Sequence, residues 1–261
     1  ANVTRSAVSL SDDGQTVAIG AIYNDGNGSN SGHVRIYSLA GSAWSKLGAD
    51  IDGEAGGDYS GANVTRSAVS LSNDGQTVAI GAPRNGSSFG QFSRSGHVRI
   101  YSWDGAVWVQ VGADINGEAA GDHSGSSVSL SADGQTVAIS ANRNSDGGTW
   151  AGHTRIYSWD GLAWNKLGED IDGESAGDNS GCRVSLSADG RTVAIGAHLN
   201  DGNGNNCGHV RVYKLENIQV GIEVLKENGI SAYPNPTKGI VNLEFAQNNI
   251  HKVIISDITG K

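Results

Sequence analysis

The sequence predicts an all-β protein, a β-propeller of four-stranded blades, because one strand-and-turn unit occurs four times and contains no helical pattern. The motif Asp-Gly-x-Thr-Val-Ala-Ile recurs at steps of 61, 59 and 56 residues, starting at Asp13, Asp74, Asp133 and Asp189. Gly-His-x-Arg-x-Tyr follows in every unit, starting at Gly32, Gly96, Gly152 and Gly208. A single blade cannot bury both of its faces, so we expect the units to stack face to face around an axis.

Each unit contains four strand signals, which the first unit illustrates. Residues 8–11 alternate apolar side chains with serine, and this period of two is typical of a strand. Asp13-Gly14 supplies a hairpin turn. The strand predicted at 16–21 is apolar or small on both faces, as expected for a strand between neighbouring sheets, and further strands are predicted at 33–38 and about 44–51.

The repeats define the domain organisation. We expect propeller repeats over residues 1–217, with blades at about 1–61, 62–125, 126–181 and 182–217. The fourth-strand motif Trp-x-x-x-Gly-x-Asp-Ile starts at Trp44, Trp108 and Trp164 and has no fourth copy. The sequence also opens inside a repeat, so we expect an incomplete ring and a fragment of a protein with more than four blades.

The run Thr77-Val78-Ala79-Ile80-Gly81-Ala82-Pro83 resembles the Gly-Ala-Pro half of the FG-GAP repeat of integrin α-chain propellers. Ser-Gly pairs before the blades, such as Ser60-Gly61, stand where that family has Phe-Gly. The resemblance implies an extracellular propeller used for adhesion or ligand binding. That family often holds Ca²⁺ in an Asp-rich loop between its first two strands. The loop here is Ser-x-Asp-Gly, so that calcium site is not carried over.

The repeats stop near residue 217, and we expect a linker at 218–230 followed by a truncated domain at 231–261, part of a small β-sandwich. This segment contains Tyr233-Pro234-Asn235-Pro236-Thr237-Lys238-Gly239. It ends in the pattern Ile-x-Asp-x-x-Gly-Lys, which is Ile255-Ser256-Asp257-Ile258-Thr259-Gly260-Lys261. It resembles the C-terminal sorting domain of proteins exported by the type nine secretion system of Bacteroidetes. The resemblance implies the secretion machinery as a partner and a secreted or outer-surface location, with Tyr233, Pro234, Asn235, Pro236 and Gly239 as the sorting signature.

Composition excludes several partners. The formal net charge is −9 and no basic run is present, which argues against nucleic acid. No stretch approaches the roughly 20 apolar residues of a transmembrane helix. The partners that remain are a surface glycan or a protein ligand.

Acidic junctions between the blades are the candidate metal sites. Carboxylates at alternate positions beside glycine meet part of what Ca²⁺ requires, although the spacing is not that of an EF-hand. The alternative is that these groups are solvated or accept hydrogen bonds from backbone amides. No cofactor is required, and Ca²⁺ is the candidate ion for Asp50, Asp52, Glu54, Asp58, Asp114, Glu118, Asp122, Asp170, Asp172, Glu174 and Asp178.

Other recurring side chains are interpreted as parts of the blades. One histidine opens the third strand of each unit, and these histidines are expected to be structural because equivalent positions on separate blades stand apart: His33, His97, His153 and His209. The arginine two residues later is expected to meet carboxylates such as Asp13 and its equivalents. Cys182 and Cys207 occur only in the last unit, and an exported chain favours a disulfide between them.

No catalytic constellation is found, because residues present in every blade normally serve the blade. The sequence therefore predicts a non-catalytic, surface-displayed binding or adhesion module. Its ligand contacts are expected in loops that vary between units: 22–31, 84–95, 142–151 and 198–207. The alternatives are a propeller-type polysaccharide lyase or glycosidase, which would need unmatched catalytic groups on the axis, and a passive surface scaffold.

Overall fold

The computed structural model describes residues 7–61, 68–86 and 94–215, together with the backbone of 230–233 and 242–245. All regular structure in these residues is β-strand, which confirms the predicted all-β class. The chain divides into two compact units, Ala1–Glu216 and Asn217–Lys261, and each is described by itself.

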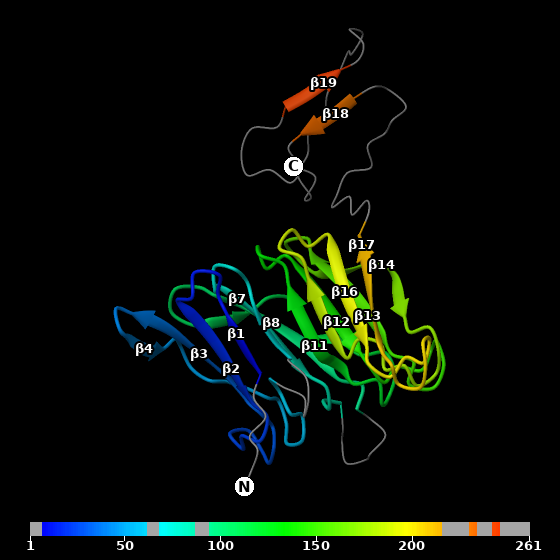
Figure 1. The fold of residues 1–261 in the computed structure, drawn as a ribbon. Helices are drawn as coiled ribbons and strands as arrows, with labels where there is room; N and C mark the ends of the chain where they lie inside the picture. Colours follow the sequence, from blue (N-terminus) through cyan, green and yellow to red (C-terminus); the bar gives the residue numbers. More distant parts are fainter. Residues whose placement is uncertain (1–6, 62–67, 87–93, 216–229, 234–241, 246–261) are drawn as a thin grey trace. The chain divides into compact units, whose positions relative to one another are not determined.

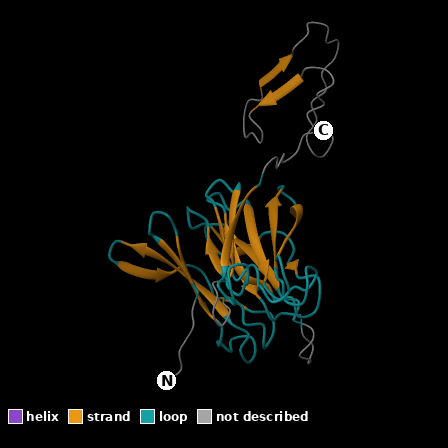
Figure 2. Ribbon diagram, turned by 45° about the vertical axis from the view of Figure 1, so that its right-hand side comes forward, coloured by secondary structure: helices purple, strands orange, loops and turns teal. Residues whose placement is uncertain are grey.

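The first unit contains four antiparallel sheets in chain order, and the first three strands of each sheet are neighbours (Figures 1 and 2). The first sheet consists of β1 (Val8–Leu10), β2 (Thr16–Ala21), β3 (His33–Ala40), β4 (Ala43–Lys46) and β5 (Ile51–Asp52). The second consists of β6 (Val69–Leu71), β7 (Thr77–Ala82), β8 (His97–Trp103), β9 (Trp108–Gln110) and β10 (Ile115–Asn116). The third consists of β11 (Ser124–Leu130), β12 (Thr136–Ala141), β13 (His153–Trp159) and β14 (Trp164–Asp172). The fourth consists of β15 (Arg183–Leu186), β16 (Thr192–Ala197) and β17 (His209–Lys214).

The structure differs from the expected elements at the fourth strand and at one blade boundary. The strand expected at 44–51 is divided into β4 and β5, both of which pair with β3, and Gly48 lies between them with a φ of 77°. In the third sheet β14 is continuous and a register shift near Thr154 absorbs the irregularity. β11 begins at Ser124, inside the range expected for the second blade.

The innermost strands of successive sheets lie side by side, as in a propeller. β1 contacts β6, β6 contacts β11, and β11 contacts β15. One hydrogen bond recurs across each boundary, in which a leucine amide donates to the serine Oγ of the preceding inner strand: Leu71 to Ser9 at 2.9 Å, Leu130 to Ser70 at 3.0 Å and Leu186 to Ser129 at 2.9 Å. The four sheets are therefore blades around a shared centre.

Three apolar cores lie between the blades. Between the first and second blades, Val34 and Ile36 of β3 pack in one cluster with Val69 and Leu71 of β6. The equivalent positions form the second and third cores, which contain Val98, Ile100, Val128 and Leu130, and then Ile156, Val184 and Leu186. Burial of this apolar area is the main stabilising contribution between blades.

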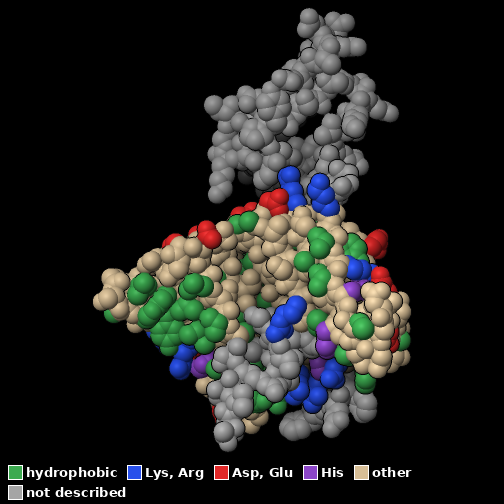
Figure 3. All heavy atoms as spheres, in the orientation of Figure 1, with side chains coloured by type: hydrophobic (Ala, Val, Ile, Leu, Met, Phe, Trp, Pro, Cys, Tyr) green, Lys and Arg blue, Asp and Glu red, His purple; other side chains and the backbone are tan. Residues whose placement is uncertain are grey.

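The first and fourth blades expose apolar side chains at positions where stacking buries them in the other blades. Val8 and Leu10 are 58% and 56% exposed, whereas Val69 and Leu71, at the same repeat positions, are 3% and 7% exposed. Apolar side chains accordingly gather on the surface over the first sheet (Figure 3). At the other end, Val210 of β17 is 66% exposed. Within the described residues, one face of the first blade and one face of the fourth blade are uncovered.

The second unit is described only by two strands. β18 (Ile230–Tyr233) pairs antiparallel with β19 (Asn242–Phe245), so that Ile230 lies opposite Phe245. β18 begins one residue before the boundary expected at 231.

Candidate functional site

The loops between the second and third strands and the turns at the blade junctions form one rim of the propeller unit, here called the loop rim. In the first blade, Asn27 of the loop donates from Nδ2 to the carbonyl oxygens of Gly53 and Glu54 in the junction, at 2.9 and 2.8 Å. A backbone hydrogen bond also joins the loop to the junction, since the amide of Ser60 donates to the carbonyl oxygen of Ser31 at 2.9 Å. In the first three blades, the described part of the loop is therefore held against the junction of its own blade.

An asparagine–aspartate pair fixes the loop rim across each blade boundary. Asn85, Asn144 and Asn200 stand at one repeat position and donate to the preceding junction: to Asp58 at 3.1 Å, to Asp122 at 3.3 Å and to Asp178 at 2.8 Å. The same carboxylate oxygens accept junction backbone amides, from Ala55 and Ala119 at 2.9 Å and from Ser175 at 3.1 Å. These three buried aspartates hold turns together, which is the alternative to metal binding that the sequence offered.

The residue just before that asparagine varies between blades and lies on the loop rim. It is Tyr23 in the first blade, arginine in the second and third (Arg84 and Arg143), and Leu199 in the fourth. Tyr23 is 48% exposed, with its ring centroid 5.9 Å from that of Tyr59. The guanidinium of Arg84 lies 4.4 Å from the centre of the Tyr59 ring. In the third blade Arg143 lies 5.8 Å from the ring of Trp150, which is 54% exposed. The rim thus presents aromatic and cationic groups that change from blade to blade.

The first aspartate of each junction is an ion-pair acceptor within its own blade, except in the second blade. Arg35 donates to Asp50 at 2.9 and 3.0 Å and Lys46 donates to it at 2.7 Å. These bonds lower the pKa of Asp50 to about 2. Asp170 is held in the same way by Arg155 and Lys166, which depresses its pKa well below the usual range.

The expectation that these arginines meet Asp13 and its equivalents is wrong. Asp13 accepts from the Ser11 hydroxyl at 2.6 Å and from the Gln15 amide at 2.9 Å, and these bonds lower its pKa. The same arrangement recurs in the other turns. The aspartate therefore accepts hydrogen bonds within its own hairpin turn, while Arg35 and Arg155 bond the junction aspartates Asp50 and Asp170.

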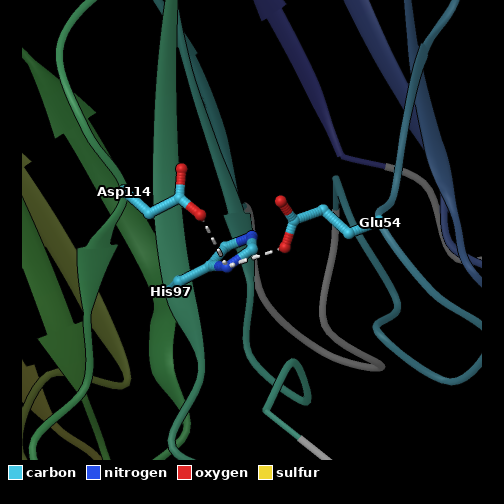
Figure 4. Close-up of side chains that lie close together, drawn as sticks. All are labelled: Glu54, His97 and Asp114. Carbon is cyan, nitrogen blue, oxygen red and sulfur yellow. Dashed lines mark ion pairs between the residues drawn. The ribbon is translucent and has the colours of Figure 1, made fainter.

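Two of the recurring histidines, His97 and His153, lie between carboxylates of successive junctions, whereas His33 lies beside Asp50 and Asp52 of one junction. His97 has Nδ1 at 3.7 Å from Glu54 Oε2 and 3.8 Å from Asp114 Oδ2 (Figure 4). His153 repeats this geometry with Glu118 and Asp170. Burial, followed by the nearby arginine, lowers the pKa of His97, His153 and His33. His209 lies 3.6 Å from Glu174.

The structure therefore groups the predicted metal-binding residues differently from the grouping by junction that the sequence predicted. Two groups of three metal-capable side chains gather in the described residues, Glu54–His97–Asp114 and Glu118–His153–Asp170, and each draws on two successive junctions. The metal residues predicted from the sequence were the carboxylates of each junction, without the histidines. Asp50, Asp52, Asp58, Asp122, Asp172, Glu174 and Asp178 join neither group. Calcium binding at the junctions stays a prediction.

Cys182 and Cys207 are free, so the disulfide favoured by the sequence is not formed in this structure. Cys182 lies at the start of the inner strand of the last blade, where its Sγ donates to the Gly196 carbonyl at 3.2 Å. Cys207 is exposed in the β16–β17 loop, beside Gly204.

Two of the fourth-strand tryptophans, Trp108 and Trp164, pack between blades, whereas Trp44 is 47% exposed. Trp108 donates from Nε1 to the Leu47 carbonyl of the preceding blade at 2.9 Å, and Trp164 donates in the same way to Val111. Beside them lie two small hollows of about 230 and 300 Å³ at equivalent positions, each lined by a tryptophan, a tyrosine and a junction aspartate. Because the same residues recur, these hollows follow from the repeat.

Within the sorting signature, Tyr233 ends β18, and Pro234, Asn235, Pro236 and Gly239 lie outside the described residues. Residues 231–261 match the family model described as the secretion system C-terminal sorting domain. The segment is a type nine secretion sorting domain, and the protein is exported, to be secreted or held at the cell surface. In the described residues, no helix is both long enough and apolar enough to cross a membrane.

Solved structures similar to this chain are β-propellers of low identity. TolB from Acinetobacter baumannii has a TM-score of 0.47 and 13% identity, and the match covers 93% of this chain and 44% of that one. Putative TolB from Agrobacterium tumefaciens has a TM-score of 0.44 and 14% identity, covering 88% and 65%. The β-propeller domain of the Trilobed protease from Pyrococcus furiosus has a TM-score of 0.44 and 13% identity, covering 90% and 66%. The chain spans less than two thirds of the first two proteins, and no curated protein matched it.

Proposed function

We propose that the chain is a non-catalytic binding or adhesion module displayed outside the cell, with its ligand contacts on the loop rim. Export rests on the sorting domain at 231–261. The ligand is a surface glycan or a protein, and the propeller acts as a rigid scaffold for the loops.

The observation that carries this proposal is the contrast between fixed and variable positions on the loop rim. The Asn–Asp pairs are the same at three blade boundaries. The residue before the asparagine changes from Tyr23 to Arg84, Arg143 and Leu199, of which Tyr23 and Arg143 are exposed. A fixed frame that carries changing aromatic and cationic groups suits recognition, since aromatic rings and arginine supply much of the contact energy at binding sites.

Two other functions are less well supported. A polysaccharide lyase or glycosidase would need a paired set of acidic or Tyr/His groups that breaks the repeat at the axis, and the inner strands that surround the axis carry mainly Val, Leu and Ser. A passive scaffold would not need exposed aromatic side chains such as Trp150 on a loop.

Glycan and surface-protein arrays probed with the full chain test the proposal. Trp150→Ala removes an exposed loop aromatic, and Trp44→Ala is the matched control, since Trp44 is 47% exposed on a blade edge away from the loops. We expect binding to fall at least about tenfold for Trp150→Ala and to persist for Trp44→Ala. Turnover of a polysaccharide would favour the enzyme instead. Equal loss in both variants, or no binding by the wild type, would contradict the proposal.

Export is tested separately. Deletion of 231–261 is expected to leave the protein inside a host that carries the secretion machinery, while a fusion of this segment to an unrelated carrier is exported. Surface labelling of intact cells measures both.

A further inference from the structure

We propose that Glu54, His97 and Asp114 form a binding site for a divalent cation of the zinc class at the boundary between the first and second blades. The donor atoms are Glu54 Oε2, His97 Nδ1 and Asp114 Oδ2. Figure 4 shows one oxygen of each carboxylate directed at the same ring nitrogen. Glu54 comes from the first junction and Asp114 from the second, so the site exists only where two blades meet.

The distances suit a shared ion better than hydrogen bonds. His97 Nδ1 lies 3.7 Å from Glu54 Oε2 and 3.8 Å from Asp114 Oδ2. Hydrogen bonds of this kind have donor–acceptor distances of about 2.7–3.2 Å. Zinc bonds of about 2.0–2.2 Å in tetrahedral geometry place ligand atoms about 3.4 Å apart. Small rotations of the carboxylates would bring them in, and the Glu54 and Asp114 side chains are 44% and 28% exposed.

His97 is the second observation that points to a ligand. Its side chain is 1% exposed, and its Nε2 is buried without a hydrogen-bond partner among the described residues. The atom that faces the two carboxylates is Nδ1, which lies beyond hydrogen-bond distance of both at 3.7 and 3.8 Å, whereas the unpartnered Nε2 lies on the other side of the ring.

The equivalent cluster in the next blade shows why this one is distinctive. There, Arg155 bonds both Glu118 and Asp170, and Lys166 donates to Asp170 at 2.7 Å. Two cations thus neutralise two carboxylates.

In the Glu54–His97–Asp114 cluster, Gln110 stands at the repeat position of Lys166 and donates to Asp114 at 2.7 Å. Arg99 turns to the Asp52 carbonyl at 2.7 Å and stays 3.8 Å from Glu54. No Lys or Arg in the described part of the chain lies within ion-pairing distance of Asp114. One negative charge is therefore left over beside His97, and the amide of Asn85 is the other donor to Glu54 Oε2, at 3.1 Å.

The donor set selects the ion. One imidazole nitrogen and two carboxylate oxygens suit zinc and its neighbours Mn²⁺, Co²⁺ and Ni²⁺. Ca²⁺ prefers six to eight oxygen ligands, and this site offers a nitrogen and few oxygens. The inference is therefore distinct from the calcium sites expected from the sequence.

Isothermal titration of Zn²⁺ into the chelator-treated full chain tests the site. We expect one saturable equivalent in the wild type. Glu54→Gln and Gln110→Lys should each weaken it at least about tenfold, because the first removes a charged ligand and the second restores the missing cation. Glu118→Gln, the same change in the neutralised cluster, should leave the affinity unchanged. Circular dichroism confirms that each variant is folded.

Three results would overturn the proposal. The first is the absence of saturable Zn²⁺ binding to the wild type. The second is unchanged affinity in Glu54→Gln, or equal loss in Glu118→Gln. The third is loss of binding in Cys207→Ser, which would assign the ion to the exposed thiol. Ca²⁺ that competes with Zn²⁺ at equal concentration would also contradict the donor-set argument.

Discussion

The sharpest stability prediction concerns a glycine on which two blades meet. A Cβ at Gly81 would lie 2.1 Å from the carbonyl oxygen of Gly125 and 3.0 Å from its Cα, both backbone atoms of the next blade. Backbone cannot rotate away as a side chain can, so Gly81→Ala must push the third blade outward. Overpacking of this kind costs about 3 kcal/mol, the upper end of the usual range. For a domain of this size that lowers Tm by about 6–12 °C.

Gly196 is the matched control because it occupies the same repeat position in the last blade. A Cβ there would meet only Cys182 Sγ at 3.4 Å and the Arg183 carbonyl at 3.7 Å, which are ordinary contacts. Neither glycine has a positive φ, so alanine adds no backbone strain. Gly196→Ala should change stability by less than about 1 kcal/mol, and in the favourable direction if the unfolded chain is stiffened. Thermal unfolding followed by circular dichroism measures both, and equal losses in the two variants would refute the close approach.

Two further predictions use the same logic of unequal repeats. Leu130→Ala should lower the free energy of unfolding by about 2–5 kcal/mol, because Leu130 is 7% exposed. Leu10→Ala, at the equivalent position that is 56% exposed, should lower it far less. Urea unfolding measures both, and equal losses in the two variants would contradict the stacking of the blades. Asp170→Asn should lower stability at pH 7 by about 3 kcal/mol, because it breaks a largely buried pair with Arg155. Since the folded pKa of Asp170 is depressed, its pair stabilises the fold above the unfolded pKa near 3.9 and is lost as pH falls through the lower folded value. The gap between wild type and Asp170→Asn should therefore narrow as pH falls from about 4 toward 2, and a constant gap would assign the loss to packing.

Much of the blade could be predicted because its signals are local. The strand at Thr16–Ala21 and its Asp13-Gly14 turn follow from alternation and turn chemistry within a few residues, and both lie where expected. The recurrence of the unit also predicted that the blades stack face to face, since no single sheet could cover its own apolar faces. The uncovered Val8 and Leu10 then follow from the absence of a preceding described blade.

The side-chain partners across blade boundaries could not be predicted because they join residues about 40 to 60 positions apart. Arg99 reaches the Asp52 carbonyl and His97 lies beside Glu54, both across a blade boundary whose register the sequence does not state. One signal was present: Gln110 breaks the Lys46–Lys166 repeat beside Asp114. A search for exceptions to the repeat would have found the uncompensated carboxylate. The Cys182–Cys207 pairing was inferred from export and from the number of cysteines; both residues lie in the last blade, and both thiols are free in this structure.

The account depends on successive inner strands bonding through serine hydroxyls, and amide hydrogen exchange at Leu130 tests this most directly. The Leu130 amide donates to Ser70 Oγ, and the Leu186 amide donates to Ser129 Oγ one boundary further on. We predict slow exchange at both amides in the wild type, with Ser70→Ala raising the rate at Leu130 at least about tenfold and leaving Leu186 unchanged. Rapid exchange at Leu130 in the wild type, or no change in the variant, would contradict the packing of blades around a common centre.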